Sequence, residues 1–518
     1  MAAPGGQCYV DGDTSPLNAV ARALLQVQHL FGVVPSIRSK GAAARKVLQK
    51  LFHLRRESEA QGGSKSSSSN LQGGQSGDGA TYGAIDTLVI LDREVDLISP
   101  LVTPLTYEGL IDEIVTIENG RIKLDASVMG DESDDQLPLK MPTIPGMAMP
   151  DVPAAEPAAA LKRAPGEKVA LSLNNSDVIF SEIRDLSIER IGAFLQERAI
   201  RIRKSYAKFR DNKDASISEI HDFVKKIPSL TKEYKALNQH INIAELLKQT
   251  TDSRGFREQW QGERGMLEGE AYLDQIEDMI CADVDRALFY KTLRLLCIQS
   301  LTSGGIRSNR YDSIKRLLVQ TYGFEQLFTV SNLERAGLLK RKDLVLVETT
   351  SVWQSLRQRL RLIDERALNM SKPDDISYVA AGYAPLSARL VQMLASSSWS
   401  AMGDIMRLLP GPLLEFTQLE RPEELSEAVA REAANDKPLQ ALAVPAPGPE
   451  LAGGGPAEGG GKRVMLLFMV GGLTFLEVAA LRFLSRDPAY PYTIIMATTK
   501  LITGTSMLKS LSHDFKAP

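Results

Sequence analysis

Cysteine and histidine are scarce in this chain, with 3 cysteines and 5 histidines among 518 residues. Cys8, Cys281 and Cys297 are odd in number and far apart, so they form neither a disulfide framework nor a zinc set. No HExxH motif is present, and no cysteine pairs with a histidine at metal-ligand spacing. These absences predict that no metal is bound, and they favour a reducing compartment.

An excess of either charge is also missing, because 61 basic residues face 64 acidic ones for a net charge of −3. A near-neutral chain is a poor candidate for binding nucleic acid through its overall charge, so we expect no nucleic-acid partner.

A transmembrane run is missing as well. The most apolar stretch, Val464–Phe483, is split by Gly471 and Gly472 and contains Glu477 and Arg482. The N-terminus lacks the basic and apolar regions of a signal peptide. We therefore expect a soluble protein that reaches membranes only through its partners.

Phosphate-binding motifs are absent, since neither GxxxxGK[ST] nor GxGxxG occurs. Asp92 and Asp96 nevertheless follow the apolar run Thr87–Leu91, at the end of a predicted strand, where ligands and catalytic acids collect in α/β sheets. They could hold Mg²⁺ or act as acid and base, or they could tie the strand end to the next loop together with Arg93. No nucleophile–base pair accompanies them, so the pattern favours a binding protein without a cofactor. An α/β enzyme or nucleotide-binding protein with its site at Asp92 and Asp96 is the alternative.

Three apolar runs, Thr87–Leu91, Val464–Val470 and Thr493–Ala497, are typical of strands buried on both faces. The helical pattern of Thr474–Leu484 lies between the last two and completes a βαβ unit. Because these segments lie near both ends of the chain, we predict one parallel, helix-covered sheet that both ends build. The fold class is α/β plus a mainly helical insertion. Two further helices are predicted before the first strand, at residues 16–31 and 42–55.

The insertion contains helices whose apolar residues repeat every three or four positions. One such stripe covers residues 188–209, and another covers 230–244 after a short helix that Pro228 is expected to stop. Consecutive stripes of this kind predict a helical hairpin. Its segment Arg198–Arg210 carries many basic side chains. This segment is either the solvated face of a helix, a site for nucleic acid or anionic lipid, or a docking surface for an acidic partner helix.

The segment Asp86–Ile114, DTLVILDREVDLISPLVTPLTYEGLIDEI, resembles the signature of the Sec/Munc (SM) family, the syntaxin-binding regulators of vesicle fusion. Further blocks resemble the branch of that family that serves tethering complexes: QCYVDGDTSPLNAVARALLQVQHLFGVVP, HINIAELLK, QTYGFEQLFTVSNLERAGLLK, ISYVAAGYAPLSARL and GGLTFLEVAALRFLSR with IIMATTKLITGTSML. Together they cover nearly the whole chain apart from its loops.

The resemblance implies a SNARE-binding subunit of HOPS and CORVET tethering complexes, not an enzyme. Such a subunit promotes SNARE assembly and vesicle docking and fusion at the late endosome and the lysosome or vacuole. Its implied partners are SNARE proteins, the other HOPS and CORVET subunits, and the C-terminal part of the vacuolar protein sorting-associated protein 16. It would be cytoplasmic and peripheral on those membranes.

The family's layout also implies how the chain is divided. Two segments of domain 2, at 1–104 and 376–518, enclose a helical domain 3a at 105–255 and a helical domain 3b at 256–375. Disordered loops are predicted where core-forming residues are lacking, at 57–82, 130–166 and 421–462. The chain begins where the first segment of domain 2 is already under way, so we expect the family's domain 1, one wall of the SNARE cleft, to be missing.

Two sets of contact residues are implied by the resemblance. In the stretch KRLLVQTYGFEQL, Lys315, Phe324 and Leu327 match the family's contact for the tethering partner, where the aromatic residue is usually Tyr and the aliphatic one Ile. The alternative is that Phe324 and Leu327 are core residues. The family's SNARE surface matches the hairpin at about 188–247. There an acidic SNARE helix would meet four basic residues, Arg201, Arg203, Lys204 and Lys208.

Overall fold

A computed structural model describes residues 12–61, 84–126, 168–210, 217–342, 351–364, 373–395, 399–417 and 462–512. The predicted loop at 130–166 lies outside the described residues, as do 62–82 of the first loop and 421–461 of the last. Residues 57–61, predicted as loop, instead form the last turns of a helix that extends to Gln61. This stretch is polar but rich in helix formers, and a lack of apolar residues shows only that a segment does not enter the core.

A five-stranded sheet forms the centre of the molecule, in the order β7–β1–β2–β8–β9. Its strands are β1 (Ser36–Lys40), β2 (Thr87–Asp92), β7 (Leu413–Thr417), β8 (Arg463–Val470) and β9 (Tyr492–Thr498). β2 pairs in parallel with β8, so the prediction that both chain ends build one sheet is confirmed. β1 and β9 are parallel to them as well, but the edge strand β7 is antiparallel to β1.

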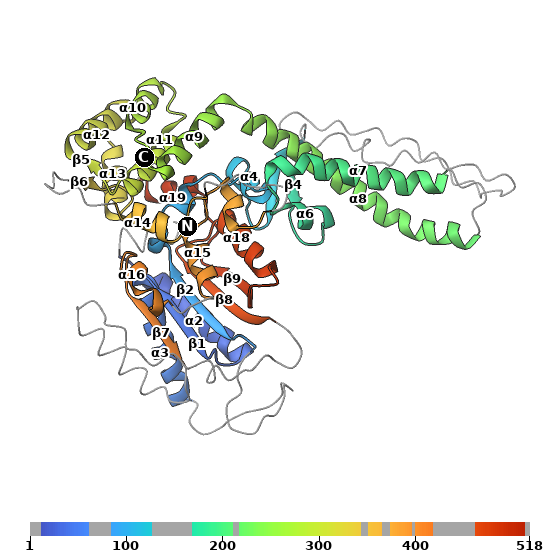
Figure 1. Ribbon diagram of the computed structural model, residues 1–518, viewed down its shortest axis with the longest axis horizontal. Coiled ribbons are helices and arrows are strands. Elements are labelled where there is room, and N and C mark those ends of the chain that lie inside the picture. The colour runs from blue at the N-terminus through green and yellow to red at the C-terminus, as the bar shows by residue number, and fades with distance from the viewer. Residues whose placement is uncertain are drawn as a thin grey trace.

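Helices cover both faces of this sheet (Figure 1). α2 (Ser15–Phe31) and α3 (Ala42–Gln61) pack on one face, where Leu88 and Ile90 of β2 contribute to the core. α15 (Leu386–Met393) and α18 (Phe475–Arg486) pack on the other face, where Val89 and Leu91 point. The unbroken apolar run of β2 is therefore explained by burial on both sides.

The insertion begins with α4 (Tyr107–Ile114), the strand pair β3 (Arg121–Asp125) and β4 (Lys168–Ser172), and α6 (Val178–Ile183). Two long helices, α7 (Ile188–Arg210) and α8 (Ile217–Thr251), then lie side by side and project from the body as the predicted hairpin (Figure 1). Pro228 lies inside α8, so the prediction that it stops a helix is wrong. It is exposed, and packing of the apolar face of α8 on α7 outweighs the local cost of a proline.

The rest of the insertion is a second helical group with its own core. It contains α9 (Arg254–Glu268), α10 (Leu273–Ala282), α11 (Phe289–Thr302), α12 (Ser308–Tyr322), α13 (Gln326–Arg335), α14 (Val352–Arg359) and the short strands β5 (Ile306–Arg307) and β6 (Arg341–Lys342). Trp353 and Leu356 of α14 are buried instead in the core that α15 and α18 form with the sheet. The C-terminal helix α19 (Gly504–Leu511) packs on α11 and joins this group to the sheet.

Five short elements complete the described structure: η1 (Arg93–Val95), η2 (Ser99–Leu101), η3 (Ile376–Ala380), η4 (Ser400–Met402) and α16 (Gly403–Met406). Among the residues described, no helix is both long and apolar enough to cross a bilayer.

Candidate functional site

Asp92, the first candidate carboxylate, caps a helix of its own chain. It is 1% exposed, and its carboxylate accepts a hydrogen bond from the backbone N–H of Ala43, at 2.6 Å, in the first turn of α3. A helix N-terminus beside a parallel strand end is a common place for a bound phosphate. In this chain the Asp92 carboxylate occupies that position. Gly41 permits this approach, because a Cβ there would lie 2.2 Å from the Cβ of Asp92.

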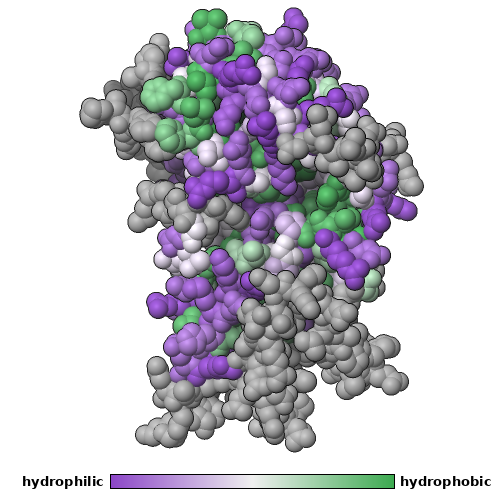
Figure 2. Space-filling view, turned by 90° about the vertical axis from the view of Figure 1, so that its left-hand side faces the viewer, coloured by the Kyte–Doolittle hydropathy of each residue, from purple (hydrophilic) through white to green (hydrophobic). Residues whose placement is uncertain are grey.

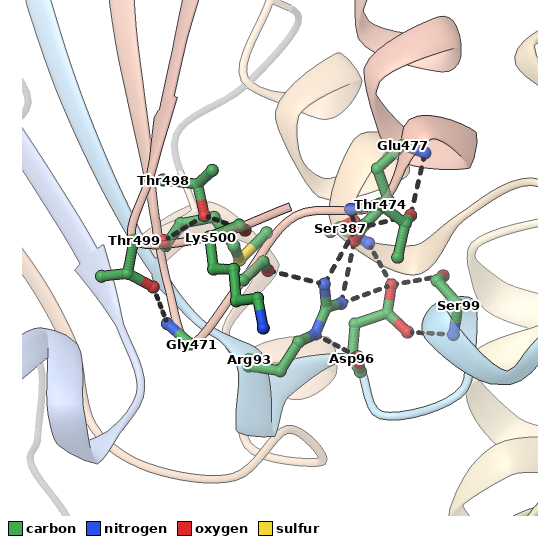
Figure 3. Close-up of polar contacts among 12 residues, drawn as sticks. Arg93, Asp96, Ser99, Ser387, Gly471, Thr474, Glu477, Thr498, Thr499 and Lys500 are labelled. Atoms are coloured by element: carbon green, nitrogen blue, oxygen red, sulfur yellow. Dashed lines mark hydrogen bonds and ion pairs between the residues drawn. The ribbon is translucent and has the colours of Figure 1, made fainter. Parts of the chain in front are cut away.

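Asp96, the second candidate, belongs to a buried polar network with Arg93 and Glu477 (Figure 3). The Arg93 guanidinium donates to both carboxylate oxygens of Glu477, at 2.8 Å each, and to the backbone carbonyl of Asp96, also at 2.8 Å. The Asp96 carboxylate accepts from the backbone N–H and hydroxyl of Ser99, at 3.0 and 2.6 Å, and from the backbone N–H of Ser387 at 2.9 Å. Both carboxylates are at most 2% exposed.

Glu477 also forms a capping box with Thr474 at the N-terminus of α18. Burial alone would raise the pKa of the Glu477 carboxyl, but the charge and hydrogen bonds of Arg93 lower this pKa below its usual value. Glu477 is therefore held ionised against Arg93. The network joins the end of β2, which lies in the signature segment Asp86–Ile114, to α18, the helix that follows β8. This geometry favours the interpretation that the strand-end residues hold the sheet together.

The junction between α12 and α13 carries the second set of predicted residues. Gly323 ends α12 with a positive φ of 103°, and its N–H donates to the Val319 carbonyl at 3.0 Å. Phe324 is 67% exposed and Leu327 42% exposed, so the alternative that they are core residues is wrong. Lys315 is partly exposed, with its ammonium 3.6 Å from the Glu334 carboxylate.

This junction rests on a packed base. The Tyr322 hydroxyl donates to the Asp283 carboxylate at 2.7 Å, and the Tyr322 ring lies 4.7 Å from that of Phe289, centroid to centroid. The hydrogen bond holds the loop between α10 and α11 against the end of α12. In that loop Val284 is 87% exposed, and Phe328 of α13 is 47% exposed. Sequence reasoning missed both residues, because periodicity does not distinguish an exposed apolar residue from a buried one. Figure 2 faces this side of the molecule and shows hydrophobic side chains at the surface among hydrophilic ones.

The third set lies on the hairpin. Arg201, Arg203 and Lys204 are exposed on α7, whereas the side chain of Lys208 lies outside the described residues. Arg201 pairs with Glu197 at 3.2 Å in an exposed ion pair. The neighbouring Ile200 is 46% exposed, so this part of α7 offers an apolar side chain among cations.

Contacts of α4 hold the base of the hairpin. The Tyr107 hydroxyl lies 3.0 Å from Nδ1 of the buried His240 of α8, and the other ring nitrogen of His240 lies 3.0 Å from the Asp177 carboxylate. Glu108 of α4 forms an ion pair with Arg482 of α18. These links fix the orientation of the hairpin relative to the sheet.

The sheet is mostly parallel and is built from both ends of the chain, and the helical insertion that projects from it carries exposed hydrophobic and basic side chains. These features define a mixed α/β scaffold for binding other proteins. The Sec1 family profile matches residues 4–510. The chain belongs to the Sec1 family, which is the Sec/Munc family that its signature segment resembles, so the resemblance is confirmed.

Relatives support this assignment along the whole sequence. The chain is 34% identical over 506 residues to the vacuolar protein-sorting-associated protein 33 homolog of Arabidopsis thaliana, an alignment that covers 97% of this chain and 72% of the relative. It is 33% identical to vacuolar protein sorting-associated protein 33A of Rattus norvegicus, covering 98% and 72%. Identity to the human 33B protein is 25%, covering 98% and 73%. Family and relatives make this a protein of vesicle trafficking, as predicted.

Solved structures confirm the fold. The Unc18–syntaxin 1 complex from Monosiga brevicollis matches with a TM-score of 0.58 and 14% identity, over 99% of this chain and 74% of that chain. The SM protein Vps45 in complex with the Qa SNARE Tlg2 matches with a TM-score of 0.57 and 13% identity, over 96% and 70%.

Proposed function

We propose that this protein is a SNARE-binding subunit of HOPS- and CORVET-type tethering complexes that acts at late endosome and lysosome or vacuole membranes. The names of its relatives refer to vacuolar protein sorting, and two solved structures of similar fold contain a syntaxin or a Qa SNARE. It would act by binding and not by catalysis, since protein groups engage both candidate carboxylates, Asp92 and Asp96.

The single observation that supports the proposed tethering contact is the exposure of the Phe324 side chain. A large aromatic side chain that is 67% exposed on a firmly held turn is an expected anchor for a partner. Phenylalanine has about 200 Å² of surface, so burying the exposed part at about 25 cal/mol per Å² would contribute about 3 kcal/mol. Leu327 extends the apolar contact, and Lys315 supplies a charge at its rim. The partner would be the C-terminal part of the vacuolar protein sorting-associated protein 16.

The SNARE contact would use the α7 side of the hairpin. Arg201, Arg203 and Lys204 provide positive charge for an acidic helix, and the exposed Ile200 provides an apolar contact. We include Lys208 on the sequence pattern alone.

The test of the tethering contact is Phe324→Asp, measured by titration calorimetry against the C-terminal part of the vacuolar protein sorting-associated protein 16. Because Phe324 is exposed, the variant should fold like the wild type, and binding should weaken by roughly a hundredfold or more. Phe31→Asp is the matched control, since Phe31 is 52% exposed at the end of α2, on a different helix. Unchanged affinity in Phe324→Asp, or equal losses in both variants, would refute the proposed contact.

A further inference from the structure

The second helix of the hairpin carries a lysine stripe, which we define as Lys225, Lys226 and Lys232 of α8. All three side chains are exposed. Lys225 and Lys232 are seven residues apart and therefore lie on the same side of the helix, with Lys226 about a quarter-turn away. Within the described part of the chain, no carboxylate forms an ion pair with any of the three.

Among the side chains that the structure describes around the stripe, none compensates its charge. Between positions 197 and 240, the carboxylates whose side chains the structure describes are those of Glu197 and Glu233. Glu197 pairs with Arg201 at 3.2 Å, and Glu233 pairs with Arg198 at 2.7 Å. The hairpin projects from the body of the molecule, so the outer part of α8 can reach a surface that the sheet domain does not touch (Figure 1).

The chemistry of the stripe distinguishes it from the α7 surface. A helix that docks on another helix needs apolar anchors at spacings of three, four and seven residues. Between the lysines the exposed residues are Pro228 and Ser229, whereas the apolar Ile227 and Leu230 are half-buried. Further along α8 the apolar side is used against α7, where Leu237 is 2% exposed. Lysine ammonium groups are compact, hydrated point charges, which suit a layer of lipid headgroups better than a shaped protein groove.

We propose that the lysine stripe of α8 is a docking surface for anionic membrane lipids. It would orient the hairpin so that the α7 surface stays free for a protein partner. This contact revises the expectation that the protein reaches membranes only through its partners. Each lysine near an anionic surface changes the vesicle partition coefficient about fivefold, so the three together account for roughly a hundredfold. The contact should weaken steeply with salt, because exposed charges are screened.

The experiment is vesicle flotation of the full chain. Vesicles of phosphatidylcholine with about 30% phosphatidylserine are compared with pure phosphatidylcholine vesicles, at about 50 mM and about 500 mM salt. The test variant is Lys225→Gln/Lys226→Gln/Lys232→Gln. The matched control is Lys168→Gln/Lys248→Gln/Lys291→Gln, which removes the same charge from exposed positions outside the stripe. Binding of both variants to a SNARE helix is measured in parallel.

The proposal expects wild type and control to float with anionic vesicles at low salt, the test variant to lose this binding by roughly a hundredfold, and SNARE binding to be unchanged. It is overturned if the wild type does not bind anionic vesicles, if it binds neutral vesicles equally, or if test variant and control lose binding to the same extent. A test variant that loses SNARE binding and keeps vesicle binding also overturns it, because the stripe would then belong to a protein partner.

Discussion

Replacing Glu477 by glutamine tests whether the buried network is structural. The glutamine keeps the size of the side chain but leaves the Arg93 guanidinium, 2% exposed, without the carboxylate that now accepts two hydrogen bonds from it at 2.8 Å. Asp96 is the remaining anion near Arg93 in this network, and its carboxylate lies 3.5 Å away. Removing one partner of a buried pair typically costs about 3–5 kcal/mol. Since domains are stable by only about 5–15 kcal/mol, this loss should be large enough to measure directly.

The assay is urea unfolding followed by far-ultraviolet circular dichroism. The control is Glu258→Gln, which removes the partner of Arg254 from an exposed ion pair and should leave the free energy of unfolding nearly unchanged. The lowered pKa of Glu477 also fixes the pH dependence. Its stabilising contribution is present above the unfolded-state pKa and is lost as the pH falls through the lower folded-state value. A loss below about 1 kcal/mol for Glu477→Gln at neutral pH would refute the structural role of the pair.

Two further predictions concern single buried positions. Burial raises the pKa of the Asp112 carboxyl to about 6. The charges of Glu113 and Glu108 add to this effect, and a hydrogen bond from the Ile117 N–H opposes it. Asp112→Asn should therefore stabilise the protein by about 2–3 kcal/mol at about pH 8. This gain should vanish as the pH falls through about 6 to below 4, because aspartate is then protonated in both states, and a pH series of urea titrations checks it. Gly41→Ala should cost at least about 2 kcal/mol in the same assay, because its Cβ would lie 2.2 Å from the Cβ of Asp92. Gly323→Ala, which has a similar positive φ but open space around it, should carry only the backbone cost of about 1–3 kcal/mol and so lose less than Gly41→Ala, and equal losses would contradict the steric argument.

The apolar patterns predicted the centre of the sheet because its strands are buried on both faces. β2 and β8 were found for this reason, and α18 from its helical spacing. β9 was found from the same apolar pattern, but the expectation that it is buried on both faces is wrong, because β9 is an edge strand and its Ile495 is 47% exposed. β1 and β7 were not predicted, since SIRSK and LLEFT are short and partly polar. Their pairing depends on a neighbouring strand that is distant in sequence. The extent of α8 through Pro228 could not be predicted either, because packing against α7 decides it.

The candidate surfaces were located partly by resemblance and partly by residue type. Periodicity allowed Phe324 to be either core or surface, and only the packing of Tyr322 and Asp283 beneath the junction shows that it points outward. The exposed Val284 carried no sequence signal. In the sequence Lys232 is separated from Lys225 and Lys226 by the mixed segment 227–231, and the three residues become one surface only when α8 is formed.

The central claim is that two separate surfaces bind two different protein partners. The most direct measurement is the affinity of two variants, Phe324→Asp and Arg203→Glu/Lys204→Glu, for two ligands. The first ligand is the C-terminal part of the vacuolar protein sorting-associated protein 16, and the second is a SNARE helix. We predict that Phe324→Asp loses the first ligand and keeps the second. The double charge reversal should weaken SNARE binding by at least about tenfold and leave the first ligand bound as in the wild type. If either variant lost both ligands equally while remaining folded, or if neither changed any affinity, the account would be contradicted.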